Sequence, residues 1–213
     1  MTGLAEALAP LPLIAILRAL KPERAEEVGG ALVGAGFRAL EVPLNSPEPI
    51  RSIALLAEAF GRRAVVGAGT VRGADEVRAV AEAGGALIVM PHWDEAVVRA
   101  AKRAGLWAVP GVATPTEAFA ALDAGADALK MFPAETLPPA AVKAWRAVLP
   151  ESCLLIPVGG IRPESLAPYL AAGAGAFGIG SALFTPDLAT DEIAARARAF
   201  AAAWDAASAA RAR

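Results

Sequence analysis

The sequence predicts an α/β protein, a single-domain (β/α)8 TIM barrel, on three observations. The chain has 213 residues, a length that suits one domain with one sizeable core. Short β-type apolar runs recur roughly every 20 to 27 residues, and an Ala-rich stretch with helical spacing follows each run. Eight such units fit a small (β/α)8 barrel. A doubly wound open sheet is the alternative fold.

The eight predicted strands are the apolar runs that are rich in β-branched and small residues. They cover Leu13–Leu17, Ala39–Val42, Ala64–Gly67, Ala86–Met90, Trp107–Val109, Ala128–Met131, Leu154–Val158 and Ala176–Ile179. Because each is followed by a helical stretch, all of them are expected to be parallel.

The predicted helices lie between these strands and carry recognisable start and stop signals. Helical spacing covers, for example, Pro22–Ala35, Pro47–Phe60, Ala74–Ala83 and Thr114–Ala124. Asp94 and the Thr114-Pro115 step are typical N-terminal caps. Several helices end on an Ala-Gly step, where glycine supplies a left-handed C-cap: Gly36, Gly84, Gly105, Gly125 and Gly173.

Two terminal segments complete the single domain, which is expected to span residues 1–213. Within the N-terminal segment 1–11, Thr2–Ala9 is expected to form a short helix that closes the bottom of the barrel. A long Ala/Arg helix is expected over about 191–213. No linker or low-complexity segment divides the chain.

Composition argues against several classes of function. The net charge is −2, and the 20 basic residues are scattered, so no nucleic-acid partner is expected. One cysteine, Cys153, and one histidine, His92, argue against a disulfide framework and against metal sites that need several imidazoles, although a carboxylate-bound metal stays open. The apolar runs are too short to span a bilayer, and Met1–Pro10 does not resemble a signal peptide, so a cytoplasmic protein is expected.

Polar residues end four of the predicted strands, and the active sites of barrels lie at the carboxyl ends of strands. These residues are Arg18, Glu41, Thr70 and Lys130. Because side chains alternate along a strand, each is expected to share a face with the small or apolar residue two positions earlier, which are Ile16, Ala39, Ala68 and Ala128. We therefore expect a cation, a carboxylate, a hydroxyl and an amine to converge at the barrel mouth.

Lys130 is the sharpest of these observations, because lysine is rarely placed in an apolar strand unless it is paired or reactive. The chain has 20 basic residues, and a lysine rather than an arginine stands at this point. An amine can lose its proton and attack a carbonyl, whereas a guanidinium cannot. Burial would lower the pKa of the amine. The alternative is that Lys130 pairs structurally with Glu41 or extends to solvent at a sheet edge.

The other three polar residues fit the same chemistry. A Schiff-base reaction needs a proton shuttle, which Glu41 is suited to provide, although Glu41 also suits a structural pair with Arg18 or Lys130. Arg18 is suited to a bidentate contact with a carboxylate, and Thr70 to a hydrogen bond with the same group. A solvated strand end remains the alternative for Arg18.

Two Gly-rich turns follow the last two predicted strands. One contains Val158, Gly159 and Gly160, and the other contains Gly180 and Ser181. Backbone N–H groups in such turns bind anions, and the loops after the seventh and eighth strands form the common phosphate site of barrels. The two turns together predict a phosphorylated ligand.

Taken in order, these motifs resemble the 2-keto-3-deoxy-6-phosphogluconate (KDPG) and 2-keto-3-deoxy-6-phosphogalactonate (KDPGal) aldolase family. The resemblance rests on the segments Pro12–Arg18, Glu41–Pro47, Gly67–Val71, Leu129–Glu135 and Val158–Ile161, and it runs from about Pro12 to Phe184. It implies a trimeric class I aldolase that needs no metal or cofactor. Lys130 would be the Schiff-base lysine and Glu41 the proton shuttle. The remaining implied contacts are Arg18 and Thr70 with the pyruvate carboxylate, and Gly159, Gly160, Gly180 and Ser181 with the phosphate.

Within this family the residues lean toward the KDPGal type. Val158 and Asn45-Ser46 stand where KDPG enzymes tend to carry polar residues, so Val158 and Asn45 are expected to contact substrate and affect the choice of C4 epimer. Phe132–Glu135 is closer to the KDPG pattern, so KDPG remains the alternative substrate. A non-covalent sugar-phosphate isomerase or epimerase, or a silent binding protein, would keep the glycines but would not need Lys130.

Overall fold

The computed structural model describes residues 3–211 and contains parallel β-strands that alternate with helices. The strands are β1 (Leu13–Ile16), β2 (Ala39–Pro43), β3 (Val65–Gly69), β4 (Leu87–Val89), β5 (Trp107–Val109), β6 (Gly111–Val112), β7 (Leu129–Met131), β8 (Leu155–Pro157) and β9 (Phe177–Ile179). Their positions confirm the eight predicted apolar runs. The short β6 was not predicted, because it is only two residues long and is separated from β5 by Pro110 alone.

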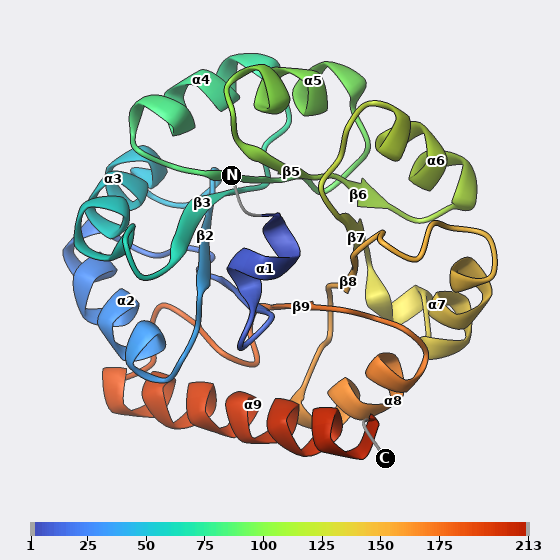
Figure 1. Ribbon diagram of the computed structural model, residues 1–213. Coiled ribbons are helices and arrows are strands. Elements are labelled where there is room, and N and C mark those ends of the chain that lie inside the picture. The colour runs from blue at the N-terminus through green and yellow to red at the C-terminus, as the bar shows by residue number, and fades with distance from the viewer. Residues whose placement is uncertain (1–2, 212–213) are drawn as a thin grey trace.

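Most of the helices lie around the outside of these strands, whereas α1 lies in the middle of the view (Figure 1). They are α1 (Leu4–Leu8), α2 (Ala25–Gly34), α3 (Pro49–Phe60), α4 (Ala74–Glu82), α5 (Glu95–Arg103), α6 (Pro115–Asp123), α7 (Pro139–Arg146), α8 (Leu166–Ala171) and α9 (Thr190–Arg211). Short 3-10 helices occupy Pro22–Arg24, Ala134–Thr136 and Pro163–Ser165. The last two residues of the helix expected over 191–213 lie outside the described residues.

The predicted helix ends are confirmed in most cases. Asp94 accepts a hydrogen bond from the backbone N–H of Val97, and Thr114 forms a capping box with Glu117. The five glycines of the Ala-Gly steps all have positive φ, between 73° and 107°. The start of α3 was predicted too early, because Glu48 adopts a left-handed conformation with φ of 40° and the helix begins only after it.

The strands form two hydrogen-bonded groups with parallel pairing throughout. The first has the order β5-β4-β3-β2-β1-β9, and the second has the order β6-β7-β8. Hydrogen bonds also connect the two groups at both edges. The amide of Asp127 donates to the carbonyl of Ala108 at 2.9 Å, the amide of Gly175 donates to the carbonyl of Leu155 at 3.0 Å, and Val158 forms a parallel bridge with Gly178.

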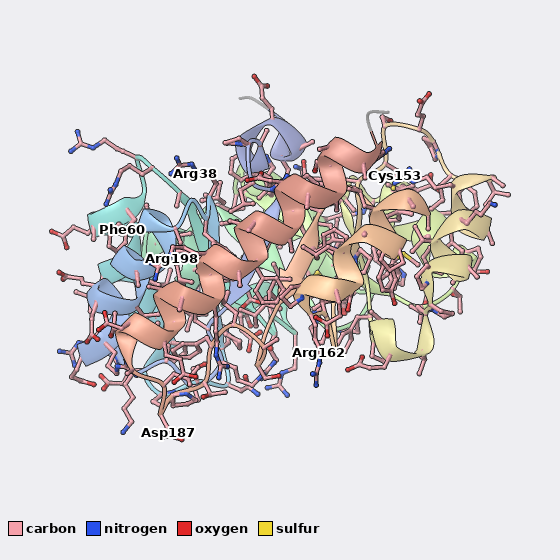
Figure 2. The ribbon with its side chains drawn as sticks, turned by 90° about the horizontal axis from the view of Figure 1, so that it is seen from below. Arg38, Phe60, Cys153, Arg162, Asp187 and Arg198 are labelled. Carbon is pink, nitrogen blue, oxygen red and sulfur yellow. The ribbon has the colours of Figure 1, made fainter. Side chains whose placement is uncertain are left out.

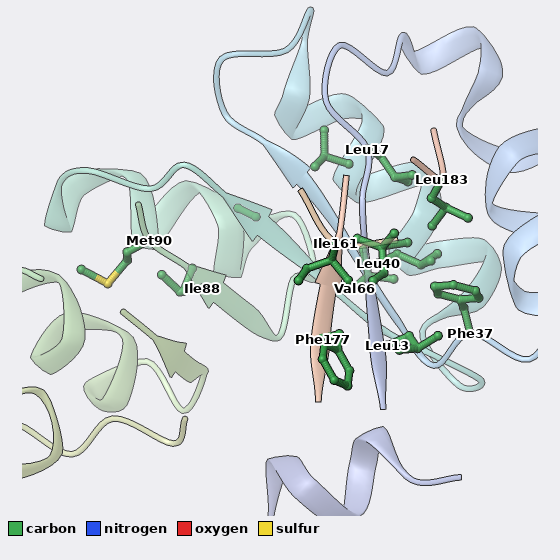
Figure 3. Close-up of a cluster of buried hydrophobic side chains, with 14 of the residues drawn as sticks. Leu13, Leu17, Phe37, Leu40, Val66, Ile88, Met90, Ile161, Phe177 and Leu183 are labelled. Atoms are coloured by element: carbon green, nitrogen blue, oxygen red, sulfur yellow. The ribbon is translucent and has the colours of Figure 1, made fainter. Parts of the chain in front are cut away.

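Two clusters of buried apolar side chains lie on the two faces of these strands. The outer cluster packs the strands against the helices and includes Leu13, Phe37, Leu40 and Phe177 (Figure 3). The inner cluster contains Ile14, Ile16, Ala39, Leu87, Val89, Val109, Ala128, Ile156, Val158 and Ala176, together with Leu4 and Leu8 of α1. The expected N-terminal helix therefore covers the inner cluster, leaving the carboxyl ends of the strands open.

Candidate active site

A cavity of about 700 Å³ lies where the strands end, and it collects side chains from across the fold. Nine of the ten residues expected in the site line it: Arg18, Glu41, Thr70, Lys130, Val158, Gly159, Gly160, Gly180 and Ser181. The wall between them includes Ile16, Pro91 and Phe132. The convergence expected from the strand ends is therefore present.

Glu41 lies on β2 at the floor of this cavity and is 2% exposed. Its Oε2 atom is buried and has no hydrogen-bond partner. Burial raises the pKa of Glu41 from 4.5 to about 7, against the opposing effects of the positive charges on Lys130 and Arg18. Near neutral pH the carboxyl group is therefore able both to take up and to release a proton.

Lys130 lies on β7 and is 7% exposed. Burial lowers the pKa of its amine, Glu41 opposes this effect, and the charge of Arg18 adds to it. The Nζ atom lies 4.5 Å from the centre of the Phe132 ring. Within residues 3–211, the salt bridges include neither Lys130 nor Glu41, so the alternative of a direct structural ion pair between them is not observed.

Arg18 reaches the same cavity from the end of β1 and is fixed by two hydrogen bonds. Its Nη1 atom donates to Oδ1 of Asn45 at 2.7 Å, and its Nη2 atom donates to Oγ1 of Thr70 at 3.5 Å. The buried Ser46 supports the same loop, because its Oγ accepts a hydrogen bond from the amide of Ala19 at 2.9 Å. The Asn45-Ser46 pair therefore orients the Arg18 loop, and Asn45 is not among the residues that line the cavity.

The expected shared face is present for three of the four polar residues and absent for the fourth. Ile16, Ala39 and Ala128 belong to the inner cluster, whereas Ala68 packs in the outer cluster with the helices. The prediction for Ala68 was wrong because Thr70 has a positive φ of 55°, which breaks the alternation at the end of β3. Thr70 reaches the cavity through this turn rather than through the period of the strand.

Gly69 is a residue of this site that the sequence analysis missed. A Cβ atom built on Gly69 would overlap the carboxyl group of Glu41. The missing side chain therefore leaves the space that the Glu41 carboxyl occupies. The available signal was a pair of glycines, Gly67 and Gly69, inside an apolar strand, since such glycines often mark a close approach.

The Gly-rich turn after β8 requires glycine at two successive positions. Gly159 and Gly160 have φ values of 108° and 63°, which other residues adopt only with strain. The side chain of Glu135 lies against both glycines, since Cβ atoms built on them would meet it first. Glu135, Arg162 and Arg196 also line the cavity, and none of them was predicted as a site residue.

Two further findings concern the whole described part of the chain. No group of three or more His, Cys, Asp or Glu side chains is arranged to hold a metal ion within residues 3–211. Among the described helices, none combines the length and apolarity needed to cross a membrane.

Comparison with known proteins defines the class to which this fold and site belong. Residues 4–198 match the family described as KDPG and KHG aldolase. The chain is 48% identical over 195 residues, 92% of each chain, to the probable 2-dehydro-3-deoxy-6-phosphogalactonate aldolase of Rhizobium meliloti (strain 1021). It is 45% identical to the 2-dehydro-3-deoxy-6-phosphogalactonate aldolase of Escherichia coli (strain K12), covering 91% of this chain and 95% of the relative.

Solved structures give the same result. The native KDPGal structure superposes with a TM-score of 0.92 at 44% identity, covering 94% of this chain and 97% of that one. KDPG aldolase from Legionella pneumophila, with pyruvate captured as a covalent carbinolamine, superposes with a TM-score of 0.82 at 27% identity, covering 94% and 98%. The chain belongs to the KDPG and KHG aldolase family. It is therefore an aldolase, a carbon–carbon lyase.

Proposed function

We propose that this aldolase uses Lys130 to cleave 2-dehydro-3-deoxy-6-phosphogalactonate (KDPGal) to pyruvate and D-glyceraldehyde 3-phosphate. The observation that carries the proposal is a buried amine and a buried carboxyl group that face one cavity without an ion pair. Burial moves their two pKa values toward neutrality from opposite directions. The names of the relatives support the substrate.

Bond cleavage begins when the Nζ atom of Lys130 attacks the C2 ketone of the substrate. The carbinolamine loses water after Glu41 protonates its hydroxyl group, and an iminium ion results. The C4 hydroxyl then gives its proton to the Glu41 carboxylate, and the C3–C4 bond breaks. Its electron pair neutralises the iminium ion, so that glyceraldehyde 3-phosphate leaves and a pyruvate enamine remains on Lys130.

The second half of the reaction returns the enzyme to its starting state. Glu41 gives the proton to C3 of the enamine, which restores the iminium ion. Water adds at C2, the Glu41 carboxylate takes up the proton that is released as the C–N bond breaks, and pyruvate leaves with Lys130 as the free amine. A carboxyl group with a pKa of about 7 suits this cycle, because it accepts and donates protons with comparable ease near neutral pH.

The two ends of the cavity suit the two charged ends of the substrate. Arg18, with Thr70 beside it, binds the pyruvate carboxylate, and the hydrogen bond that Arg18 donates to Oδ1 of Asn45 orients the guanidinium for that contact. Gly159, Gly160, Gly180 and Ser181 bind the phosphate at the other end. Fixing both ends holds C2 over Lys130, which converts the attack into an intramolecular step.

Val158 favours the galactonate epimer over the gluconate epimer, which is the second candidate substrate. Its apolar side chain lines the cavity beside Gly159 and cannot form a hydrogen bond with the C4 hydroxyl. Val158→Thr should shift the ratio of kcat/KM values toward KDPG by about 2 to 13-fold, the usual worth of one neutral hydrogen bond. A wide wild-type preference for KDPG, or an unchanged ratio in the variant, would make Val158 a packing residue.

The strands form one closed (β/α)8 barrel, in which β5 and β6 together act as one strand. Support comes from the hydrogen bonds that join the two strand groups at both edges.

The chain assembles as a homotrimer, as the family resemblance implies. The hydrophobic content of 56% supports this assembly, because surplus apolar surface is commonly buried between subunits. Light scattering should give three times the chain mass of 21.6 kDa, and a concentration-independent monomer would refute the trimer.

The test of the proposed function is product formation from both epimers. We expect stoichiometric pyruvate and glyceraldehyde 3-phosphate, with KDPGal cleaved at least as well as KDPG. An isomerase or epimerase would return a rearranged sugar acid and no pyruvate. A binding protein would show saturable affinity for the substrate without turnover. Either of the last two results would overturn the proposal.

A further inference from the structure

Arg162 presents an uncommitted positive charge to the phosphate end of the cavity. It follows the Gly159-Gly160 turn by two residues and lines the same cavity as Lys130. Figure 2 shows it at the end of the molecule opposite Arg38 and α1. Its backbone amide donates to Oγ of Ser165 at 3.2 Å, which ties the backbone of Arg162 to the 3-10 helix that follows. The backbone of Arg162 is therefore held directly after the turn that contains Gly159 and Gly160.

The other cation at this end of the cavity is already engaged. Arg196 of α9 donates to Oε1 of Glu192 at 2.6 Å. By contrast, within residues 3–211 the guanidinium of Arg162 forms no salt bridge and no side-chain hydrogen bond. Its donors are therefore available to a bound anion.

A cation is needed here because an acidic side chain lies over the cradle. Glu135 lies against Gly159 and Gly160, where backbone N–H groups would otherwise meet a phosphate. Glu164 lines the cavity nearby. A carboxylate at this distance opposes a phosphate dianion, whereas a guanidinium offsets that repulsion and bonds phosphate oxygens in pairs.

We propose that Arg162 binds the phosphate of the substrate and selects phosphorylated over unphosphorylated sugar acids. The inference rests on the proposed function and adds a side-chain contact to the glycine turns. Arg162 is exposed, so water and salt screen its attraction to the phosphate. We therefore expect the contact to raise kcat/KM about tenfold rather than several hundredfold. Glu135 acts in the opposite direction at the same end of the substrate.

The experiment compares two substrates that differ only in the phosphate: KDPGal and unphosphorylated 2-dehydro-3-deoxygalactonate. Arg162→Gln should lower kcat/KM for KDPGal about tenfold and change that for the unphosphorylated acid by less than about twofold. Glu135→Gln should raise the ratio of kcat/KM for KDPGal to kcat/KM for the unphosphorylated acid. Arg198→Gln is the matched control, because Arg198 is an exposed residue of α9 (labelled in Figure 2) that does not line the cavity. Equal losses on both substrates, or no loss on either, would overturn the proposal.

A binding measurement separates this proposal from the proposed function. Calorimetric titration with glycerol 3-phosphate should show weaker binding by Arg162→Gln than by the wild type and Arg198→Gln. The difference should shrink as salt is added. If the wild type cleaves neither epimer, the proposed function fails, and this titration still decides the role of Arg162. Equal affinities of the three proteins would refute it.

Discussion

Two lysine–carboxylate pairs in this molecule differ in their exposure and in whether the two side chains form an ion pair. Lys102 and Asp127 lie at the surface, with Nζ 2.6 Å from Oδ2, and their side chains are 36% and 21% exposed. Asp127 also accepts a hydrogen bond from the amide of Ala108 at 2.8 Å. Lys130 and Glu41 are nearly fully buried, and within residues 3–211 neither forms a salt bridge. The first pair is in direct contact, whereas the second lines a cavity without an ion pair among the described residues.

The difference shows how the same two residue types serve structure in one place and chemistry in another. An exposed, hydrogen-bonded ion pair contributes about 0 to 1 kcal/mol to stability. A buried amine and carboxyl group without that contact cost stability, but their pKa values move toward the range in which proton transfer is useful. Substitutions at the two pairs and at the glycine beside Glu41 should therefore have very different effects on turnover.

Replacement of each lysine by arginine should abolish turnover at one pair and leave it nearly unchanged at the other. Lys130→Arg keeps the charge but cannot form an iminium ion, so cleavage should be abolished. Lys102→Arg keeps the surface ion pair and should retain nearly wild-type turnover. Steady-state assays of both variants, with circular dichroism as a check of folding, measure the contrast. Residual turnover by Lys130→Arg above one part in about a thousand would contradict the assignment.

Glu41→Gln should keep the fold and slow turnover by about 10² to 10⁴-fold, the usual worth of general acid–base catalysis. The step most directly affected is protonation of the enamine. Exchange of the methyl protons of pyruvate with deuterated water, followed by NMR, reports that step alone. The matched variant Asp127→Asn should exchange at the wild-type rate. If Glu41→Gln also exchanges at that rate, another group carries the proton.

Gly69→Ala should reduce turnover by about 10²-fold, although it changes no ionisable group. The new Cβ would overlap the Glu41 carboxyl and displace it, and a shift of about 1 Å in a catalytic group has this effect. The pH profile of kcat should move as well, because the displaced carboxyl has a different environment. Gly73→Ala is the control, since no atom lies within 4 Å of a Cβ at that position. An unchanged pH profile would count against a positioning role.

The stability of the protein should depend on pH through the buried Glu41. The pKa of Glu41 is raised from 4.5 in the unfolded chain to about 7, so the native state loses stability as pH rises through this window. Glu41→Gln removes this loss. Its stability relative to the wild type should therefore increase by about 2 kcal/mol between pH 5 and pH 8. Urea unfolding at both pH values tests this, and a difference that does not vary with pH would contradict it.

The sequence was sufficient to predict where strands end and which polar side chains lie there, because both depend on local patterns. Lys130 and Glu41 were predicted to meet in this way, and both line the cavity. Features that depend on backbone conformation were not predictable in the same manner. Ala68 was predicted on the wrong face because the left-handed turn at Thr70 ends the alternation of side chains along β3. The left-handed conformation of Glu48 likewise makes α3 begin later than predicted.

Roles that arise from contacts between distant segments were also missed. The hydrogen bond that Asn45 accepts from Arg18 joins two loops that are far apart in the sequence, and the expected contact of Asn45 with substrate stays a prediction. The role of Gly69 depends on Glu41, which is 28 positions earlier in the chain. Arg162 resembles any surface arginine in the sequence, and only the fold brings it to the cavity. Residue types and spacing thus identified the chemistry, while three-dimensional packing was required to identify the supporting residues.

The most direct test of the central claim is covalent trapping of pyruvate. Borohydride added in the presence of pyruvate should reduce the iminium ion and attach one three-carbon unit per chain. Peptide mapping by mass spectrometry should then place that unit on Lys130 alone, with the surface lysines Lys102 and Lys143 unmodified. A label on either surface lysine in place of Lys130, or no label at all, would contradict the account.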